Sequence, residues 1–204
     1  MDQHAAILPD KSAGTTVTVL DLDKRAVSGK IKTGNRPKHP AVSPNGKWVM
    51  VNHWGLDDGK LRVSFIDTAT DTVAKNIDIA VAGKAAGPTS MHNAWSYDSR
   101  YAFTLDRVDD NFVIIDTTDW SVKKIKTNSK PHYVSPSPDG KEVWLTVEGK
   151  DKTTERPGAL VFEIGSFKQT ARIVRTVAAV TAEGATGYRI DNAQVEPYPW
   201  KRRR

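Results

Sequence analysis

The chain has 204 residues, no cysteine and a formal net charge of +6, of which Lys201, Arg202, Arg203 and Arg204 contribute four at the C-terminus. The lack of cysteine excludes disulfides, Cys-ligated zinc, a thiol nucleophile and the C-x-x-C-H attachment of c-type haem. No apolar run approaches the roughly 20 residues of a membrane-spanning helix, so we expect no membrane span. Without its basic tail the body is nearly neutral, which argues against nucleic acid as a partner.

Repeated units fill most of the sequence. Each unit contains about four short runs rich in Val, Ile, Phe, Trp and Thr, separated by Pro-Asn-Gly, Pro-Asp-Gly or Asp-Thr turns. The predicted regions, in chain order, are an N-terminal extension (1–14), a repeat region (15–180) made of a partial unit (15–32) and three full units (36–82, 88–127 and 131–176), and a C-terminal tail (181–204) that can supply one or two closing strands.

Four acidic residues that end apolar strands mark the period of the repeat. They are Asp21, Asp67, Asp116 and Glu163, which lie 46, 49 and 47 residues apart. Four strands at this spacing are typical of a β-propeller blade, whereas the coils of a parallel solenoid are shorter and a β-sandwich needs no fixed period. We therefore predict an all-β fold of four-stranded antiparallel blades, with about four blades visible in an incomplete ring. The Asp residues themselves are interpreted as structural turn residues.

Three segments share a further pattern of strand, serine-centred turn and second strand. They read RPKHPAVSPNGKWVMV (36–51), TSMHNAWSYDSRYAFTL (89–105) and KPHYVSPSPDGKEVWLTV (130–147). In the third, apolar residues occupy both faces of the second strand, as expected of a strand between two layers. We expect the tryptophans in or beside strands to fill the spaces between blades; these are Trp48, Trp95, Trp120 and Trp144.

These segments resemble the YVTN-type β-propeller repeat, in which a proline and an apolar strand precede Ser-Pro-Asp-Gly-Lys, a second strand and a strand ending in Ile-Asp. The resemblance covers about residues 15–176, with Tyr97-Asp98-Ser99 in place of Pro-Asp-Gly in one unit. Related propellers range from surface-layer and binding proteins to lactonases and the d-type-haem domain of dissimilatory nitrite reductases. The resemblance implies a periplasmic or extracellular location, although no secretory signal is visible at the N-terminus.

Three histidines precede the turn serines and form the main candidate site. His39, His92 and His132 lie four, four and five residues before Ser43, Ser96 and Ser137. In one interpretation their imidazoles converge at the channel mouth and bind zinc, copper or a haem iron. In the other, which the unequal spacing favours, they only begin strands, because residues one position out of phase face opposite sides of a strand.

Other candidates lie in the loops on the same face of the predicted propeller. His53, Trp54 and Arg107 are predicted to contact a ligand, and Trp54 is the tryptophan expected to do so. The acidic loop residues fit ordinary turns, with calcium binding as the alternative; they are Asp57, Asp58, Asp106, Asp109, Asp110, Glu148 and Asp151.

Three functions are consistent with these features. The first is a binding or scaffold propeller that holds a protein or small-molecule ligand on the channel-mouth face. The second is an oxidoreductase-like propeller that binds a metal or a d-type haem through histidine, His92 or His132 above all. The third is a lactonase-like hydrolase that uses loop carboxylates and histidines. No Gly-x-Ser-x-Gly, Walker or dinucleotide-binding motif is present, so the sequence leaves enzymatic activity undecided.

Overall fold

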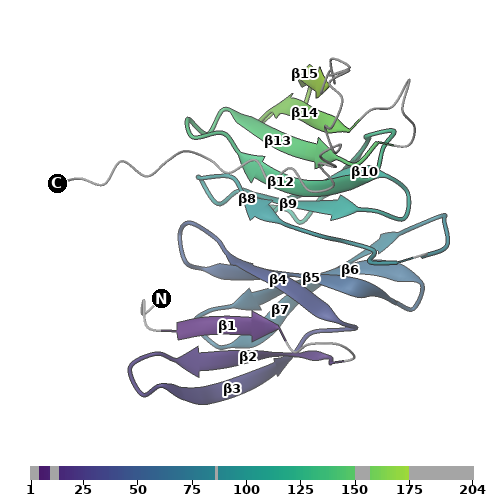
Figure 1. Cartoon of the computed structure of the whole chain (residues 1–204). Helices are drawn as coiled ribbons and strands as arrows, with labels where there is room; N and C mark the ends of the chain where they lie inside the picture. The colour runs from purple at the N-terminus through teal and green to yellow at the C-terminus, as the bar shows by residue number, and fades with distance from the viewer. Residues whose placement is uncertain (1–4, 10–13, 86, 150–156, 175–204) are drawn as a thin grey trace, which may run out of the picture.

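The computed structural model describes residues 5–9, 14–85, 87–149 and 157–174. All of the secondary-structure elements in this part of the chain are β-strands. They form four antiparallel sheets that stack one on the next (Figure 1). Each sheet is built from consecutive strands, as the blades of a β-propeller are. The described sheets do not close into a ring, and none of their residues forms a helix able to cross a membrane. The prediction of propeller blades in an incomplete ring is confirmed.

The first sheet has only three strands, in the order β1-β2-β3. They are β1 (Ala5–Pro9), β2 (Thr16–Asp21) and β3 (Ala26–Lys32). β1 lies within the predicted N-terminal extension, where five residues without alternating polarity gave no strand pattern, and it pairs antiparallel with β2. The closing strands predicted for residues 181–204 lie outside the described residues.

The other three sheets each have four strands in sequential order. The second sheet contains β4 (Pro37–Val42), β5 (Trp48–Asp57), β6 (Lys60–Asp67) and β7 (Thr72–Ala80). The third contains β8 (Ala94–Trp95), β9 (Tyr101–Asp106), β10 (Asn111–Asp116) and β11 (Val122–Lys126). The fourth contains β12 (Pro131–Pro136), β13 (Glu142–Val147), β14 (Gly158–Glu163) and β15 (Gln169–Val174). Contacts of β4 and β12 with β8 place these first strands side by side.

The serine-centred turns explain why the first two strands of each full sheet join in the same way. The Ser137 hydroxyl donates to Asp139 Oδ1 (2.6 Å) and accepts from the Glu142 N–H (3.0 Å). Gly140 closes the turn on the Ser137 carbonyl (2.9 Å) with a φ of 71°, a value that glycine adopts without strain. The same bonds recur at two other serines, Ser43 and Ser96.

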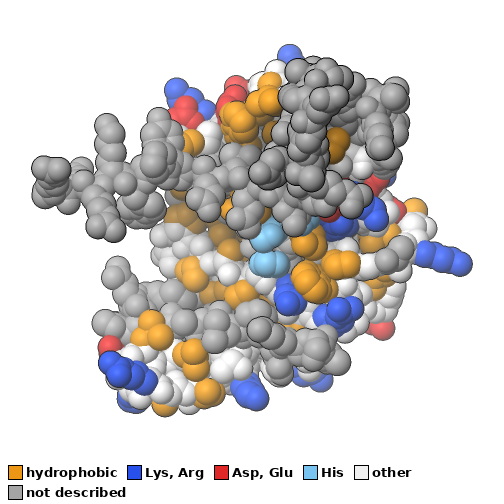
Figure 2. All heavy atoms as spheres, viewed as in Figure 1, with side chains coloured by type: hydrophobic (Ala, Val, Ile, Leu, Met, Phe, Trp, Pro, Cys, Tyr) orange, Lys and Arg blue, Asp and Glu red, His pale blue; other side chains and the backbone are white. Residues whose placement is uncertain are grey.

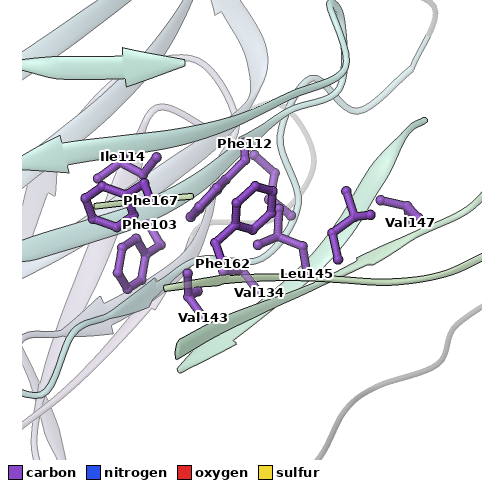
Figure 3. Packing of buried hydrophobic residues seen from close by; sticks show 11 residues of the cluster. Phe103, Phe112, Ile114, Val134, Val143, Leu145, Val147, Phe162 and Phe167 are labelled. Carbon is purple, nitrogen blue, oxygen red and sulfur yellow. The ribbon is translucent and has the colours of Figure 1, made fainter. Parts of the chain in front are cut away.

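Three apolar clusters lie between consecutive sheets. Figure 3 shows the one between the third and fourth sheets, where the rings of Phe112 on β10 and Phe162 on β14 are 5.3 Å apart. On β10, Phe112 and Ile114 belong to this cluster, whereas Val113 and Ile115 pack toward the second sheet. This strand is therefore buried on both faces. The third cluster joins the first two sheets and consists of Val17, Val19, Ile31, Val49, Val51 and Ile66.

Three of the four strand-associated tryptophans pack between sheets as predicted. Trp95 is buried between the second and third sheets and donates from Nε1 to the Ala41 carbonyl (3.0 Å). Trp48 and Trp120 pack against the same cluster. Trp144 differs, because it alternates with Val143 and Leu145 on β13 and so lies on the other face of that strand.

Leu145 tests whether the contact between sheets stabilises the fold. Its side chain is fully buried between the third and fourth sheets, so Leu145→Ala should lower the free energy of unfolding by about 2–5 kcal/mol in urea denaturation. The matched control is Leu22→Ala, since Leu22 is 47% exposed and its truncation should cost less than about 0.5 kcal/mol. Equal losses in the two variants would contradict the packing described here.

Candidate functional site

The histidine cluster, defined as His39, His92 and His132, lies where the first strands of three sheets begin. The ring centroid of His92 is 4.2 Å from that of His39 and 5.6 Å from that of His132, and Tyr133 adds a ring 4.8 Å from His92. All four side chains are half-buried. Figure 2 shows histidine side chains in the middle of one face of the molecule, between the stacked sheets. The structure thus brings together three of the predicted site residues.

Two β-bulges explain why the rings meet despite their unequal spacing. On β4, Lys38 pairs with Asn52 and Pro40 with Val51, so His39 is an extra residue opposite no partner, with a φ of 46°. On β12, His132 is likewise the extra residue between Pro131 and Tyr133. A bulge interrupts the alternation of a strand and redirects the side chain. The expectation that the third ring faces away from the others is therefore wrong.

Two asparagine side chains, one on β5 and one just before β8, hold the backbone of the cluster. Asn93 donates from Nδ2 to the His39 carbonyl (2.7 Å), which crosses from the third sheet to the second. Asn52, fully buried on β5, donates to the carbonyls of Met91 (2.9 Å) and His92 (3.3 Å) in the opposite direction. We did not predict these two residues, although a buried-strand position occupied by asparagine in WVMVNHW marks Asn52 as unusual.

The imidazoles of the histidine cluster are poor bases. Burial above all, together with the nearby rings of His39 and His132, lowers the pKa of His92 to about 4. Burial also lowers the pKa of His39, to which the charge of Lys38 adds. For His132, burial and Arg107 lower the pKa whereas Glu148 opposes them. At neutral pH the three rings are therefore neutral, and each carries one N–H donor and one acceptor.

His53 lies away from solvent, unlike the cluster. Its ring is fully buried, with Nδ1 3.3 Å from the Asn35 carbonyl and Nε2 3.0 Å from the Ser64 hydroxyl. Burial lowers its pKa to about 4. Both ring nitrogens have polar partners within the protein, so we interpret His53 as a structural residue.

Trp54 lies beneath two cations on the β4–β5 side of the histidine cluster. The Lys38 Nζ is 4.3 Å from the centroid of the Trp54 ring, and the Arg36 guanidinium carbon is 5.9 Å away. Such cation–π contacts hold a charged group over an aromatic face. The indole Nε1 is buried and has no acceptor among the described residues. The residue as a whole is half-buried.

Arg107 connects the third and fourth sheets beside His132. Its Nη1 donates to the Pro131 carbonyl and to Glu148 Oε1, both at 2.8 Å, and its side chain is only 11% exposed. The guanidinium is therefore held in place, and its charge acts on the His132 ring.

The loop carboxylates are mostly engaged by the protein itself. Asp106 accepts from the backbone N–H groups of Val108 and Asp109 and from the Asn111 amide. Asp57 accepts from the Asn35 N–H and lies 3.4 Å from Arg62. Asp109 likewise accepts from two backbone N–H groups, those of Ala82 and Gly83. These bonds support the interpretation of the acids as turn residues, while Asp151 lies outside the described residues.

The described residues contain no group of three or more His, Cys, Asp or Glu side chains arranged to hold a metal ion. A zinc site needs ligand nitrogens converging at about 2 Å from one point. In the histidine cluster the rings instead lie tilted beside one another, at interplanar angles of 41° and 53°. Metal binding by His39, His92 and His132 therefore stays a prediction, and the geometry favours contacts made by ring faces and edges.

Comparison with known proteins supports the fold. The chain is similar to a solved structure of Kuenenia stuttgartiensis hydrazine synthase, with a TM-score of 0.68 and 20% sequence identity over 85% of this chain. It spans about half of that protein, 47% of its length. No protein-family model and no curated protein matches the sequence. At this identity the likeness concerns architecture, because function resides in the site rather than the fold.

The depressed histidine pKa values predict that acid weakens the fold. The pKa of His53 is 6.5 in the unfolded chain and about 4 in the folded protein. Between these two pH values the unfolded chain binds a proton at His53 that the folded protein does not bind, so the free energy of unfolding falls as the pH drops. For His53 this amounts to roughly 3 kcal/mol. Urea denaturation near pH 7 and near pH 4 measures the fall, which should be smaller in His53→Gln. An identical fall in the variant would refute this role of His53.

Proposed function

We propose that this protein is a propeller-type binding protein whose small-molecule ligand occupies the histidine cluster. The observation that carries this proposal is the convergence of His39, His92, His132 and Tyr133, four half-buried rings from three sheets, at the ends of the first strands. Ligand sites usually combine aromatic surface with a few oriented polar groups. Neutral imidazoles supply both, since each ring presents a face, an N–H donor and a nitrogen acceptor.

The site is also held rigid before any ligand arrives. The Asn93 amide binds the carbonyl of His39, and the Asn52 amide binds that of His92. Thr104 in turn donates to Asn52 Oδ1 (2.9 Å), which fixes the orientation of that amide. A ligand would therefore meet rings already in position, and such preorganisation lowers the entropic cost of binding.

Membership of the YVTN-type family and an extracytoplasmic location are part of the same proposal. The repeated Ser-Pro-Asn-Gly-Lys and Ser-Pro-Asp-Gly-Lys turns at Ser43 and Ser137 support the family, and the hydrogen bonds described above give each turn the same structural task. The location rests on the resemblance alone. Binding is favoured over a metal- or haem-dependent reaction because the rings lie side by side instead of converging on one point.

A fragment screen followed by NMR tests the proposed site. With histidine side chains labelled, we expect bound fragments to shift the ring signals of the histidine cluster, and His92→Ala to weaken binding at least about tenfold while leaving the melting temperature close to that of the unchanged protein. His132→Ala provides a second variant of the same site. Tyr97→Ala is the control, because Tyr97 is 52% exposed in a β8–β9 turn at the opposite ends of the strands.

Fragments that bind without shifting the three histidine signals, and equally well to His92→Ala and His132→Ala, would show that the ligand site lies elsewhere.

A further inference from the structure

We infer that the ligand of the histidine cluster carries an anionic oxygen group, a carboxylate or a phosphate, which lies against Lys38 and Arg36 beside Trp54. This inference rests on the proposed function and specifies the chemistry of its ligand. It depends on three features of the same face: cations without carboxylate partners, an indole donor without an acceptor, and acids already bound by the protein.

Two cations, Lys38 and Arg36, lie over Trp54 without a described carboxylate partner. Lys38 directly precedes His39 on β4, and its charge acts on the His39 ring. Its ammonium is held 4.3 Å from the Trp54 centroid, with the exposed Arg36 guanidinium 5.9 Å away. Neither side chain forms an ion pair with a described residue, whereas Arg62, Arg100 and Arg107 each do so. Lys38 therefore brings a positive charge next to His39, the Arg36 guanidinium lies near the same Trp54 ring, and neither cation has a described carboxylate opposite it.

The supply of hydrogen-bond donors points the same way. Trp54 Nε1 is a buried donor for which the described residues provide no acceptor. Burying a donor without an acceptor is unfavourable, so such atoms mark places where a partner is missing. Lys38, Arg36 and the Trp54 indole are donors only, whereas each neutral imidazole adds one donor and one acceptor, so the site has more donors than acceptors. A carboxylate or a phosphate consists of acceptors only.

Four carboxylates in the neighbouring loops are already bound by the protein. Around the same loops, Asp57 is bound by the Asn35 N–H and Arg62, and Asp106 by three donors. Asp109 is bound by two backbone N–H groups, and Glu148 by Arg107. These carboxylates maintain loop geometry, so a cation would have to displace existing bonds before it gained new ones. The charges on this face thus favour an anion.

The chain offers an internal control for the cation–π pair. At the other end of β5, Lys47 Nζ lies 4.8 Å from the centroid of the Trp48 ring, which repeats the chemistry of Lys38 and Trp54. Trp48 begins β5 and packs against the apolar cluster between the second and third sheets, and no histidine of the cluster is near it in the sequence. A general effect of removing one lysine from a tryptophan face would therefore appear equally in both places.

Titration with matched probes tests the inference. Benzoate and benzamide have similar shapes but differ in charge, and inorganic phosphate tests the phosphate group alone. We expect benzoate to shift the His39 ring signals and the Trp54 indole N–H signal, to bind at least about fivefold more tightly than benzamide, and to bind more weakly as ionic strength rises. Lys38→Gln and Arg36→Gln should each weaken benzoate about fivefold, while Lys47→Gln should leave it unchanged.

Shifts caused by phosphate would identify it as an accepted group, and shifts by benzoate alone would restrict the site to carboxylates; both results support an oxyanion ligand. Benzamide binding as tightly as benzoate would overturn the inference while leaving the proposed binding site intact. The inference is also overturned if neither anion shifts these signals, or if Lys38→Gln and Lys47→Gln bind benzoate equally.

Discussion

The architecture depends on strands that carry apolar side chains on both faces. β10 directs Phe112 and Ile114 to one neighbouring sheet and Val113 and Ile115 to the other, so it is stable only between two sheets. Stacking follows from this requirement, and it sets the first strands of successive sheets side by side. The ends of β4, β8 and β12 then lie close together, and whatever side chains begin those strands become neighbours.

The histidine cluster adds a second constraint to that stacking. A regular strand would turn its side chains alternately to the two interfaces between sheets, but the extra residues His39 and His132 escape this alternation at bulges. Hydrogen bonds between sheets hold the backbone in the same region. Asn93 donates to the carbonyl of His39, and Asn52 donates to the carbonyl of His92. Burial and mutual proximity keep the His92 ring neutral, while Lys38 supplies positive charge beside His39.

The fold was predictable from the sequence because its determinants are local and repeated. The evenly spaced acidic residues, the serine turns and the alternating strands each specify a short piece of structure, and their period specifies the blade. For the site, the sequence predicted which residues take part but not how they are arranged. Counting from the turn serines located His39, His92 and His132, but the one-residue difference in spacing misled, because His39 and His132 are both bulge residues, to which the regular alternation of a strand does not apply. The burial of His53 and the roles of Asn52 and Asn93 depend on contacts between sheets, which no local pattern encodes.

The central claim is that two bulged strands, β4 and β12, and the segment that leads into β8 bring three imidazoles together. A nuclear Overhauser experiment on the histidine ring protons tests it most directly. The structure predicts cross-peaks from the His92 ring to those of both His39 and His132, whose centroids lie 4.2 and 5.6 Å away. Cross-peaks from His92 to His39 alone, with the His132 ring close to neither, would mean that β12 keeps its regular alternation and would contradict the account.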